Sequence, residues 1–197
     1  MRLLLARHAE TDGNRREVYL GSRDEDLNKN GVAQAEKLAL RLKDYKIDLL
    51  ISSDLKRARK TAESIDKYHK LGIEICSEIR ERSVGVFEGR PKIELLKAVG
   101  RSGKEFHEYK PKNGESCTEV KARVVPLLKK LIKENSDKTV LMVSHSGVIL
   151  ELLFYLTKLP RSEYVRLKHD RAALTIIDIG KVNKIEMLNN TDHLRHS

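Results

Sequence analysis

Apolar runs of strand length alternate with amphipathic segments along most of the chain. The strand-like runs are bounded by polar or turn-forming residues, and the segments between them repeat apolar residues at helical spacing. Strands are expected at residues 3–6, 48–52, 73–76 and 139–144. Helices are expected at residues 31–43, 54–69, 118–133 and 148–157. This alternation predicts an α/β fold, a three-layer sandwich with a mostly parallel central sheet and helices on both faces.

The last part of the chain has a different pattern. Two alternating runs, at residues 174–179 and 182–188, flank Gly180-Lys181, which is typical of a β-hairpin and predicts an antiparallel edge strand. Residues 191–197 are expected to form a frayed tail. At the helix level, Val32 is expected to point into the core, and Ser53 is expected to cap the helix that follows it.

The length of 197 residues fits one domain, residues 1–197, with a core of ordinary size. Residues 91–113 are the least regular part of it, mixing short helical patterns with charge and closing on a Pro111–Gly114 turn. We interpret this segment as an insertion that covers the active site. The long polar loop at 11–30, directly after the first strand, is also expected to be functional.

Charge and cysteine content narrow the function classes. The net charge is +10, from 39 basic and 29 acidic residues, which suits an anionic ligand. Because the basic residues are dispersed among acids and aromatics are scarce, nucleic acid is not expected as a partner. Cys76 and Cys117 form no CxxC motif, which indicates a reduced, cytoplasmic protein. No long apolar segment is present, so neither export nor a membrane partner is expected.

Cationic and imidazole side chains follow the predicted strands. Arg7 and His8 end the first strand, His145 ends the 139–144 strand, and Arg57 begins the helix after the second strand. Carboxyl ends of parallel strands share one sheet edge, so these side chains are expected to converge. Such a cluster makes a poor metal site but a good pocket for a phosphoryl dianion. One histidine could then attack phosphorus, and Glu81 is the natural proton donor.

Several short segments carry a family resemblance. They are Arg7-His8-Ala9-Glu10-Thr11 followed by Asn14, Leu27–Gly31, Ser52–Ala62, Glu81–Gly89, Asn113–Ser116 and Ser144–Gly147. In this order they are similar to the signature segments of the histidine phosphatase superfamily, in the branch that resembles cofactor-dependent phosphoglycerate mutase. Each segment alone is weakly specific, but together they extend the resemblance from residue 1 to about residue 179.

The resemblance implies a role for individual residues. His8 is implied as the nucleophile that becomes phosphohistidine, and Glu81 as the proton donor. The phosphoryl group would be bound by Arg7, Arg57 and His145. Substrate contacts are implied for Asn14, Arg15, Gly21, Ser22 and Ser146. No metal or organic cofactor is implied for the phosphatase branch.

The resemblance leaves more than one activity open. A phosphomonoesterase acting on small phosphorylated metabolites is the first, and a mutase primed by 2,3-bisphosphoglycerate is the second. A non-catalytic phospho-ligand binder is the third. The chain is shorter than a typical mutase, and residues 92–112 lack the adjacent arginines of those enzymes, which favours hydrolysis. Ala9 stands where the family usually has glycine, and we expect at most a small shift of that turn. Oligomeric state is left as monomer or homodimer.

Overall fold

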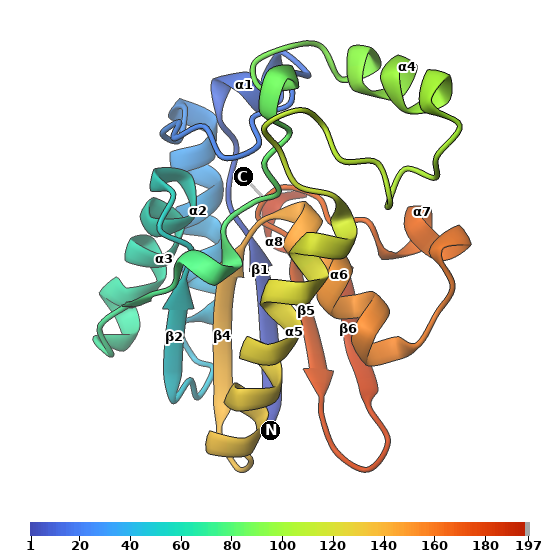
Figure 1. Cartoon of the computed structure of the whole chain (residues 1–197). Coiled ribbons are helices and arrows are strands. Elements are labelled where there is room, and N and C mark those ends of the chain that lie inside the picture. The colour runs from blue at the N-terminus through green and yellow to red at the C-terminus, as the bar shows by residue number, and fades with distance from the viewer. Residues whose placement is uncertain (196–197) are drawn as a thin grey trace.

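A six-stranded mixed sheet forms the centre of the computed structural model, which describes residues 1–195 (Figure 1). The strands are β1 (Arg2–Arg7), β2 (Leu49–Ser52), β3 (Glu74–Ile75), β4 (Thr139–Ser144), β5 (Leu174–Asp178) and β6 (Lys184–Asn190). They lie in the order β3-β2-β4-β1-β5-β6. The first four in this order pair in parallel, whereas β5 pairs antiparallel with β1 and β6 antiparallel with β5. The predicted α/β sheet with a hairpin at one edge is confirmed.

Both faces of the sheet are covered by helices, which explains why the central strands β1 and β4 are apolar between their ends. Successive side chains of β1 point to opposite faces. Leu3 and Leu5 pack with helices α5 (Cys117–Glu134) and α6 (Ser146–Thr157). Leu4 and Ala6 pack in the second core, with α2 (Lys29–Leu42) and α3 (Lys56–His69). The three-layer arrangement predicted from the alternation of strands and helices is therefore confirmed.

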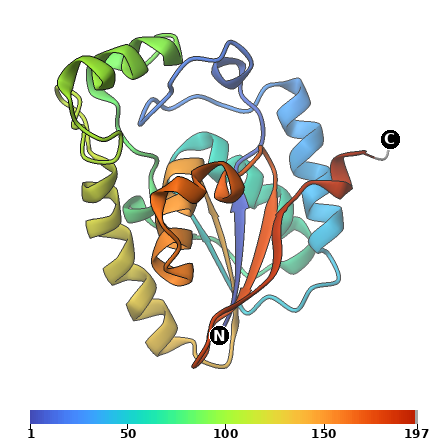
Figure 2. The same ribbon diagram turned by 90° about the vertical axis from the view of Figure 1, so that its right-hand side faces the viewer.

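The smaller elements gather mainly at the carboxyl ends of the parallel strands. Helices α1 (Asp12–Arg15) and α4 (Lys92–Ser102) lie beyond that edge, and α7 (Tyr164–Leu167) flanks it (Figures 1 and 2). Helix α8 (Asp192–Arg195) packs on α2. The 3₁₀ turns are η1 (Ser77–Ile79), η2 (Gly85–Phe87) and η3 (Arg161–Glu163). Over residues 1–195, no helix has the length and apolarity that a membrane-spanning helix requires.

Local predictions at several positions were wrong. Val32 is 50% exposed, because α2 begins at Lys29 and turns its Ala35 and Leu38 inward instead. Ser53 does not cap α3, which begins at Lys56 after Leu55 with no side-chain cap. The tail is not frayed at residues 192–195, which form α8, and residues 196–197 lie outside the described residues.

The close packing of α2 against the turn after β1 explains why residue 31, in the Leu27–Gly31 segment, is a glycine. A Cβ atom on Gly31 would lie 2.0 Å from the carbonyl oxygen of Glu10, so only glycine lets the first turn of α2 approach this closely. The side-chain amides of Asn28 and Asn30 donate to the Glu10 carboxylate at 3.0 and 3.1 Å. The turn that carries His8 is thereby fastened to a helix.

Candidate active site

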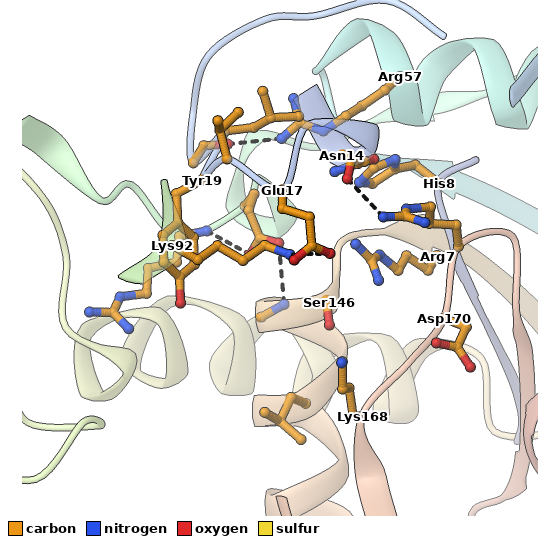
Figure 3. A pocket seen from close by; sticks show the side chains of 18 of the residues that line it. Arg7, His8, Asn14, Glu17, Tyr19, Arg57, Lys92, Ser146, Lys168 and Asp170 are labelled. Atoms are coloured by element: carbon orange, nitrogen blue, oxygen red, sulfur yellow. Dashed lines mark hydrogen bonds and ion pairs between the residues drawn. The ribbon is translucent and has the colours of Figure 1, made fainter. Parts of the chain in front are cut away.

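An open cavity of about 690 Å³ lies at the carboxyl ends of β1 and β4. Arg7, His8, Arg57, Glu81 and Ser146 line it. His145 is not among the lining residues, but it lies directly behind His8, so the four side chains that the sequence predicts to converge do lie together. Figure 3 shows Arg7 and His8 on one side of the cavity, with Tyr19 and Lys92 on the other. The convergence follows from the parallel register that pairs Arg7 with Ser144, since His8 and His145 then leave neighbouring strands at the same level.

His8 is buried and held in one orientation. Its Nδ1 atom lies 2.7 Å from the carbonyl oxygen of Ala9. Because a carbonyl oxygen only accepts, we assign the proton to Nδ1, which leaves the lone pair on Nε2. Burial, then the positive charges of Arg57 and Arg7, hold the pKa of His8 well below 6.5. The imidazole is therefore neutral and nucleophilic near neutral pH.

His145 is fully buried beside His8, with ring centroids 5.0 Å apart at 55°. Its Nε2 atom pairs with the Ser53 hydroxyl at 2.8 Å, which is the contact that Ser53 makes in place of capping α3. Burial, followed by the charges of Arg57 and of His8, lowers the pKa of His145 well below 6.5. Its Nδ1 atom is buried without a protein partner among residues 1–195, so one polar atom is left for a ligand.

The two arginines are buried cations that carbonyl groups hold in place. Arg57 is 1% exposed and donates to the carbonyl oxygens of Arg23 and Gly21 at 2.7 and 2.8 Å. Arg7 donates to the carbonyl oxygen of His169 at 2.7 Å. Burial lowers the pKa of Arg7 to about 10, so it stays charged at neutral pH. In the described part of the chain, neither guanidinium forms an ion pair and both Nε atoms lack a partner.

Glu81 lies against the first turn of α6. One carboxylate oxygen accepts from the backbone N–H of Gly147 at 3.3 Å, and the other accepts from the N–H of Arg82 at 2.9 Å. Both Ser146 and Gly147 line the cavity there. A carboxyl group is thus available beside the phosphoryl pocket, together with N–H groups at a helix N-terminus that suit an anion.

Some of the residues implied as substrate contacts line the cavity, and others do not. Asn14 and Gly21 line the cavity. Arg15 is exposed and is not among the lining residues, and Ser22 is engaged elsewhere: its N–H and hydroxyl both donate to the Glu88 carboxylate, at 2.9 and 2.8 Å. Glu88 also accepts from the Ser83 hydroxyl at 3.0 Å. Ser22 therefore joins the 11–30 loop to the 78–89 loop and does not face the cavity.

Ala9 fits its turn without strain. Its side chain is fully buried in the core under α2 and α3, and its N–H donates to the Thr61 hydroxyl at 3.1 Å. Among residues 1–195, the non-glycine residues with positive φ do not include Ala9, so alanine is tolerated where relatives have glycine.

Sequence reasoning missed some of the supporting residues. Thr61 orients the Ala9 peptide, and it belongs to the 52–62 segment, so the signal was available. His169 is 1% exposed and bonds the Thr175 hydroxyl while its carbonyl oxygen accepts from Arg7. Arg82 was not singled out, although it is buried and lines the cavity. Nothing in the local pattern around Arg82 distinguishes it from a surface arginine.

No group of three or more His, Cys, Asp or Glu side chains suited to a metal ion occurs within residues 1–195. The cavity is instead lined by two arginines and the His8 imidazole, with the His145 ring packed behind His8, a donor set that repels metal cations and attracts an anion. Metal independence stays a prediction.

Comparison with known proteins decides the family. The family model described as "Histidine phosphatase superfamily (branch 1)" matches residues 3–191. The chain belongs to the histidine phosphatase superfamily. A broad-specificity phosphatase of Saccharomyces cerevisiae is 31% identical, with 98% of this chain and 87% of the relative covered. The adenosylcobalamin/alpha-ribazole phosphatase of Escherichia coli is 29% identical, with 96% of each covered.

Solved structures of the superfamily agree with this assignment. A mycobacterial glucosyl-3-phosphoglycerate phosphatase in complex with VO3 superposes with a TM-score of 0.86 at 27% identity, covering 96% of this chain and 99% of the other. A mutant phosphoserine phosphatase of Entamoeba histolytica in complex with phosphoserine gives a TM-score of 0.86 at 26% identity, with 98% of each chain covered. This member of the histidine phosphatase superfamily is therefore an enzyme of the phosphatase and mutase-like type.

Proposed function

We propose that this protein hydrolyses phosphate monoesters of small metabolites through a phosphohistidine on His8. One observation carries the proposal. His8 presents an unprotonated Nε2 atom in a cavity that is also lined by Arg7 and Arg57, two buried arginines that form no ion pair in the described part of the chain. A phosphoryl group placed among Arg7, Arg57 and His145 would neutralise those charges.

In the first step, the Nε2 lone pair of His8 forms a bond to phosphorus while the bond from phosphorus to the alcohol oxygen breaks. Glu81 in its acid form gives its proton to the departing alkoxide. The Ala9 carbonyl, 2.7 Å from Nδ1, stabilises the positive charge that the phosphorylated ring carries. The guanidinium groups hold the equatorial oxygens as charge moves onto them.

In the second step, water attacks phosphorus and the bond between phosphorus and Nε2 breaks. Glu81, now a carboxylate, accepts a proton from that water. Inorganic phosphate leaves, and His8 returns to the neutral form that its buried, cation-rich surroundings favour. Both steps use groups already present at the cavity.

The remaining features of the proposal follow from the sequence. We propose that hydrolysis needs no metal or organic cofactor, and that 2,3-bisphosphoglycerate would act only if the enzyme were a mutase. We also propose that residues 91–113 cover the site, since Lys92 and Phe106 line the cavity. A cytoplasmic location is supported by the free thiols of Cys76 and Cys117. A monomer or a homodimer is expected.

The test compares two substrates. Purified protein in EDTA is given 4-nitrophenyl phosphate and, separately, 3-phosphoglycerate with and without 2,3-bisphosphoglycerate. We expect release of phosphate from the ester, and acid-labile phosphate on the protein after a rapid quench. Isomerisation that depends on the bisphosphate, without ester hydrolysis, would overturn the proposal in favour of a mutase.

Variants identify the nucleophile in the same assay. His8→Ala should abolish both turnover and labelling, whereas His69→Ala, at the end of α3 away from the cavity, should keep both. Labelling of the His8→Ala protein would refute the assignment of His8.

A further inference from the structure

The cavity is much larger than a phosphoryl group needs. It measures about 690 Å³, whereas a phosphoryl group occupies roughly the space of three or four waters at ~30 Å³ each. Arg7, His8 and Arg57 bound only one part of it (Figure 3). The rest of the cavity is open to the alcohol part of the substrate.

This remaining part has an aromatic and apolar wall. Tyr19 comes from the 11–30 loop, Phe106 from the segment after α4, and Tyr164 from the start of α7. Leu150 lies four residues, about 6 Å, along α6 from Ser146 and lines the same cavity. Three chain segments that are distant in sequence thus place rings around one space.

The backbone that carries the Tyr19 ring is held by hydrogen bonds, and the Phe106 ring packs against a cation. The Tyr19 backbone donates to the carbonyl oxygen of Arg90 at 3.0 Å and accepts from the N–H of Gly89 at 2.7 Å. The guanidinium of Arg82 lies 5.0 Å from the centre of the Phe106 ring, and it donates to the carbonyl oxygens of Tyr109 and Glu115. Anchored rings bind a ligand at a lower entropic cost than mobile ones.

The two tyrosine hydroxyls are free to bond a ligand. Among residues 1–195, neither the Tyr19 nor the Tyr164 hydroxyl has a hydrogen-bond partner in the protein, although both line the cavity. Burial, helped by the nearby Tyr164, raises the pKa of Tyr19 to about 12. Burial also raises the pKa of Tyr164. Both phenols therefore remain protonated donors over the working pH range.

Two of the cations on this side are already engaged, so they contribute little to the recognition of a substrate carboxylate. Lys92 pairs with Glu17 at 3.7 Å, and the Arg82 guanidinium is used by carbonyl oxygens, the Cys117 thiol and the Phe106 ring. What the wall offers is aromatic surface and hydroxyl donors.

We propose that Tyr19, Phe106, Tyr164 and Leu150 form a binding site for a flat ring carried by the alcohol part of the substrate. Ring-bearing phosphate monoesters would then be preferred over acyclic ones. The inference rests on the proposed phosphatase activity. Ring faces pack against the aromatic side chains, and heteroatoms of the substrate accept hydrogen bonds from the two phenols.

The experiment uses substrate pairs that differ in the ring alone. Adenosine 5′-monophosphate is compared with ribose 5-phosphate, and benzyl phosphate with propyl phosphate, so that the leaving alcohols within a pair are similar. We expect kcat/KM to be higher for the ring-bearing member of each pair. The two pairs separate a nucleoside base from a simple aryl ring as the preferred occupant.

Variants test the wall directly. Tyr19→Leu, Phe106→Leu and Tyr164→Leu should each reduce the preference for the ring-bearing member roughly three- to tenfold, the range of one lost aromatic contact. Tyr68→Leu, on the exposed part of α3, is the matched control and should leave the preference unchanged. Benzylphosphonate should also inhibit the unaltered protein more tightly than propylphosphonate, a measurement that does not depend on how a variant folds.

The outcomes separate the two proposals. Equal kcat/KM within both pairs, or a preference for acyclic 3-phosphoglycerate with its carboxylate near Lys168, would overturn the ring site while phosphatase activity stands. Hydrolysis of none of the esters would overturn the proposed function and the ring site with it.

Discussion

A Cβ atom on Gly147 would lie 2.5 Å from Oε1 of Glu81. The proposed acid therefore rests directly against the backbone at the start of α6, with the Gly147 N–H bonded to its other oxygen. This contact holds the carboxyl group beside the phosphoryl pocket, and it exists because residue 147 has no side chain.

Gly147→Ala should displace Glu81 and impair proton donation. We expect kcat for alkyl phosphates to fall by about tenfold or more, since general acid catalysis contributes roughly 10²–10⁴. Steady-state kinetics measures the effect. Gly100→Ala is the matched control, because a Cβ atom at that position meets nothing within 4 Å. Equal activity of the two variants would show that the Gly147 contact does not position Glu81.

Glu81→Gln removes the transferable proton and keeps the size of the side chain. Hydrolysis of alkyl esters should fall by about 10²–10⁴, because a poor leaving group needs the proton most. Hydrolysis of 4-nitrophenyl phosphate, whose leaving group is stable as an anion, should fall much less. Equal losses for both ester classes would contradict the assignment of Glu81 as the acid.

Stability should fall as the pH drops from about 6.5 to 5. His8 and His145 have pKa values well below 6.5, and burial lowers that of His169 to about 4. These side chains are neutral in the folded protein but take up protons when it unfolds below pH 6.5. The unfolded state then binds more protons, so each histidine lowers the free energy of unfolding by about 1.4 kcal/mol per pH unit.

Urea denaturation at several pH values measures this slope. His169→Gln should reduce the slope between pH 6.5 and 5 by about 1.4 kcal/mol per pH unit, because one of the titrating groups is gone. An unchanged slope would mean that His169 takes up its proton equally in both states.

Glu151 and Arg161 form an ion pair whose carboxylate is 2% exposed. Arg161→Met leaves that carboxylate buried without its partner, so the free energy of unfolding should fall by about 2–4 kcal/mol. Adding Glu151→Gln should recover part of the loss. Arg2→Met, in the exposed pair with Asp178, is the control and should cost under about 1 kcal/mol. Similar losses for both single variants would contradict the importance of burial.

The sequence predicted the fold well where a strand is covered on both faces, because such a strand is a continuous apolar run. The run at 139–144 predicts β4 as observed, since both faces of that strand are covered. Helix starts were predicted less well. Asn28 caps α2 earlier than expected, and the Ser53 hydroxyl is bonded to His145 and to the N–H of Leu55, which precedes the first residue of α3. A residue that caps helices in isolation can be diverted by a tertiary partner that lies far away in sequence.

The proposed catalytic side chains could be predicted because strand ends place them. Arg7, His8 and His145 come from neighbouring parallel strands, so their convergence is a consequence of topology. The roles of Ser22 and Arg82 could not be predicted in this way. Ser22 is bonded to Glu88, and Arg82 to the carbonyls of residues 109 and 115, contacts that depend on how two irregular loops fold against each other.

The hydrogen bonds of Arg57 to the 11–30 loop affect how this fold can acquire a new substrate specificity. Its guanidinium is bonded to the carbonyls of Gly21 and Arg23, so the loop that bounds the substrate is tied to the group expected to hold phosphate. Changes that move the backbone at 21–23 would alter chemistry and selectivity together. Glu17 and Tyr19 also line the cavity but precede residues 21–23 in the chain. Side-chain changes at these two positions would alter which alcohol is bound without moving Arg57. Directed evolution for a new substrate should therefore begin at these two positions.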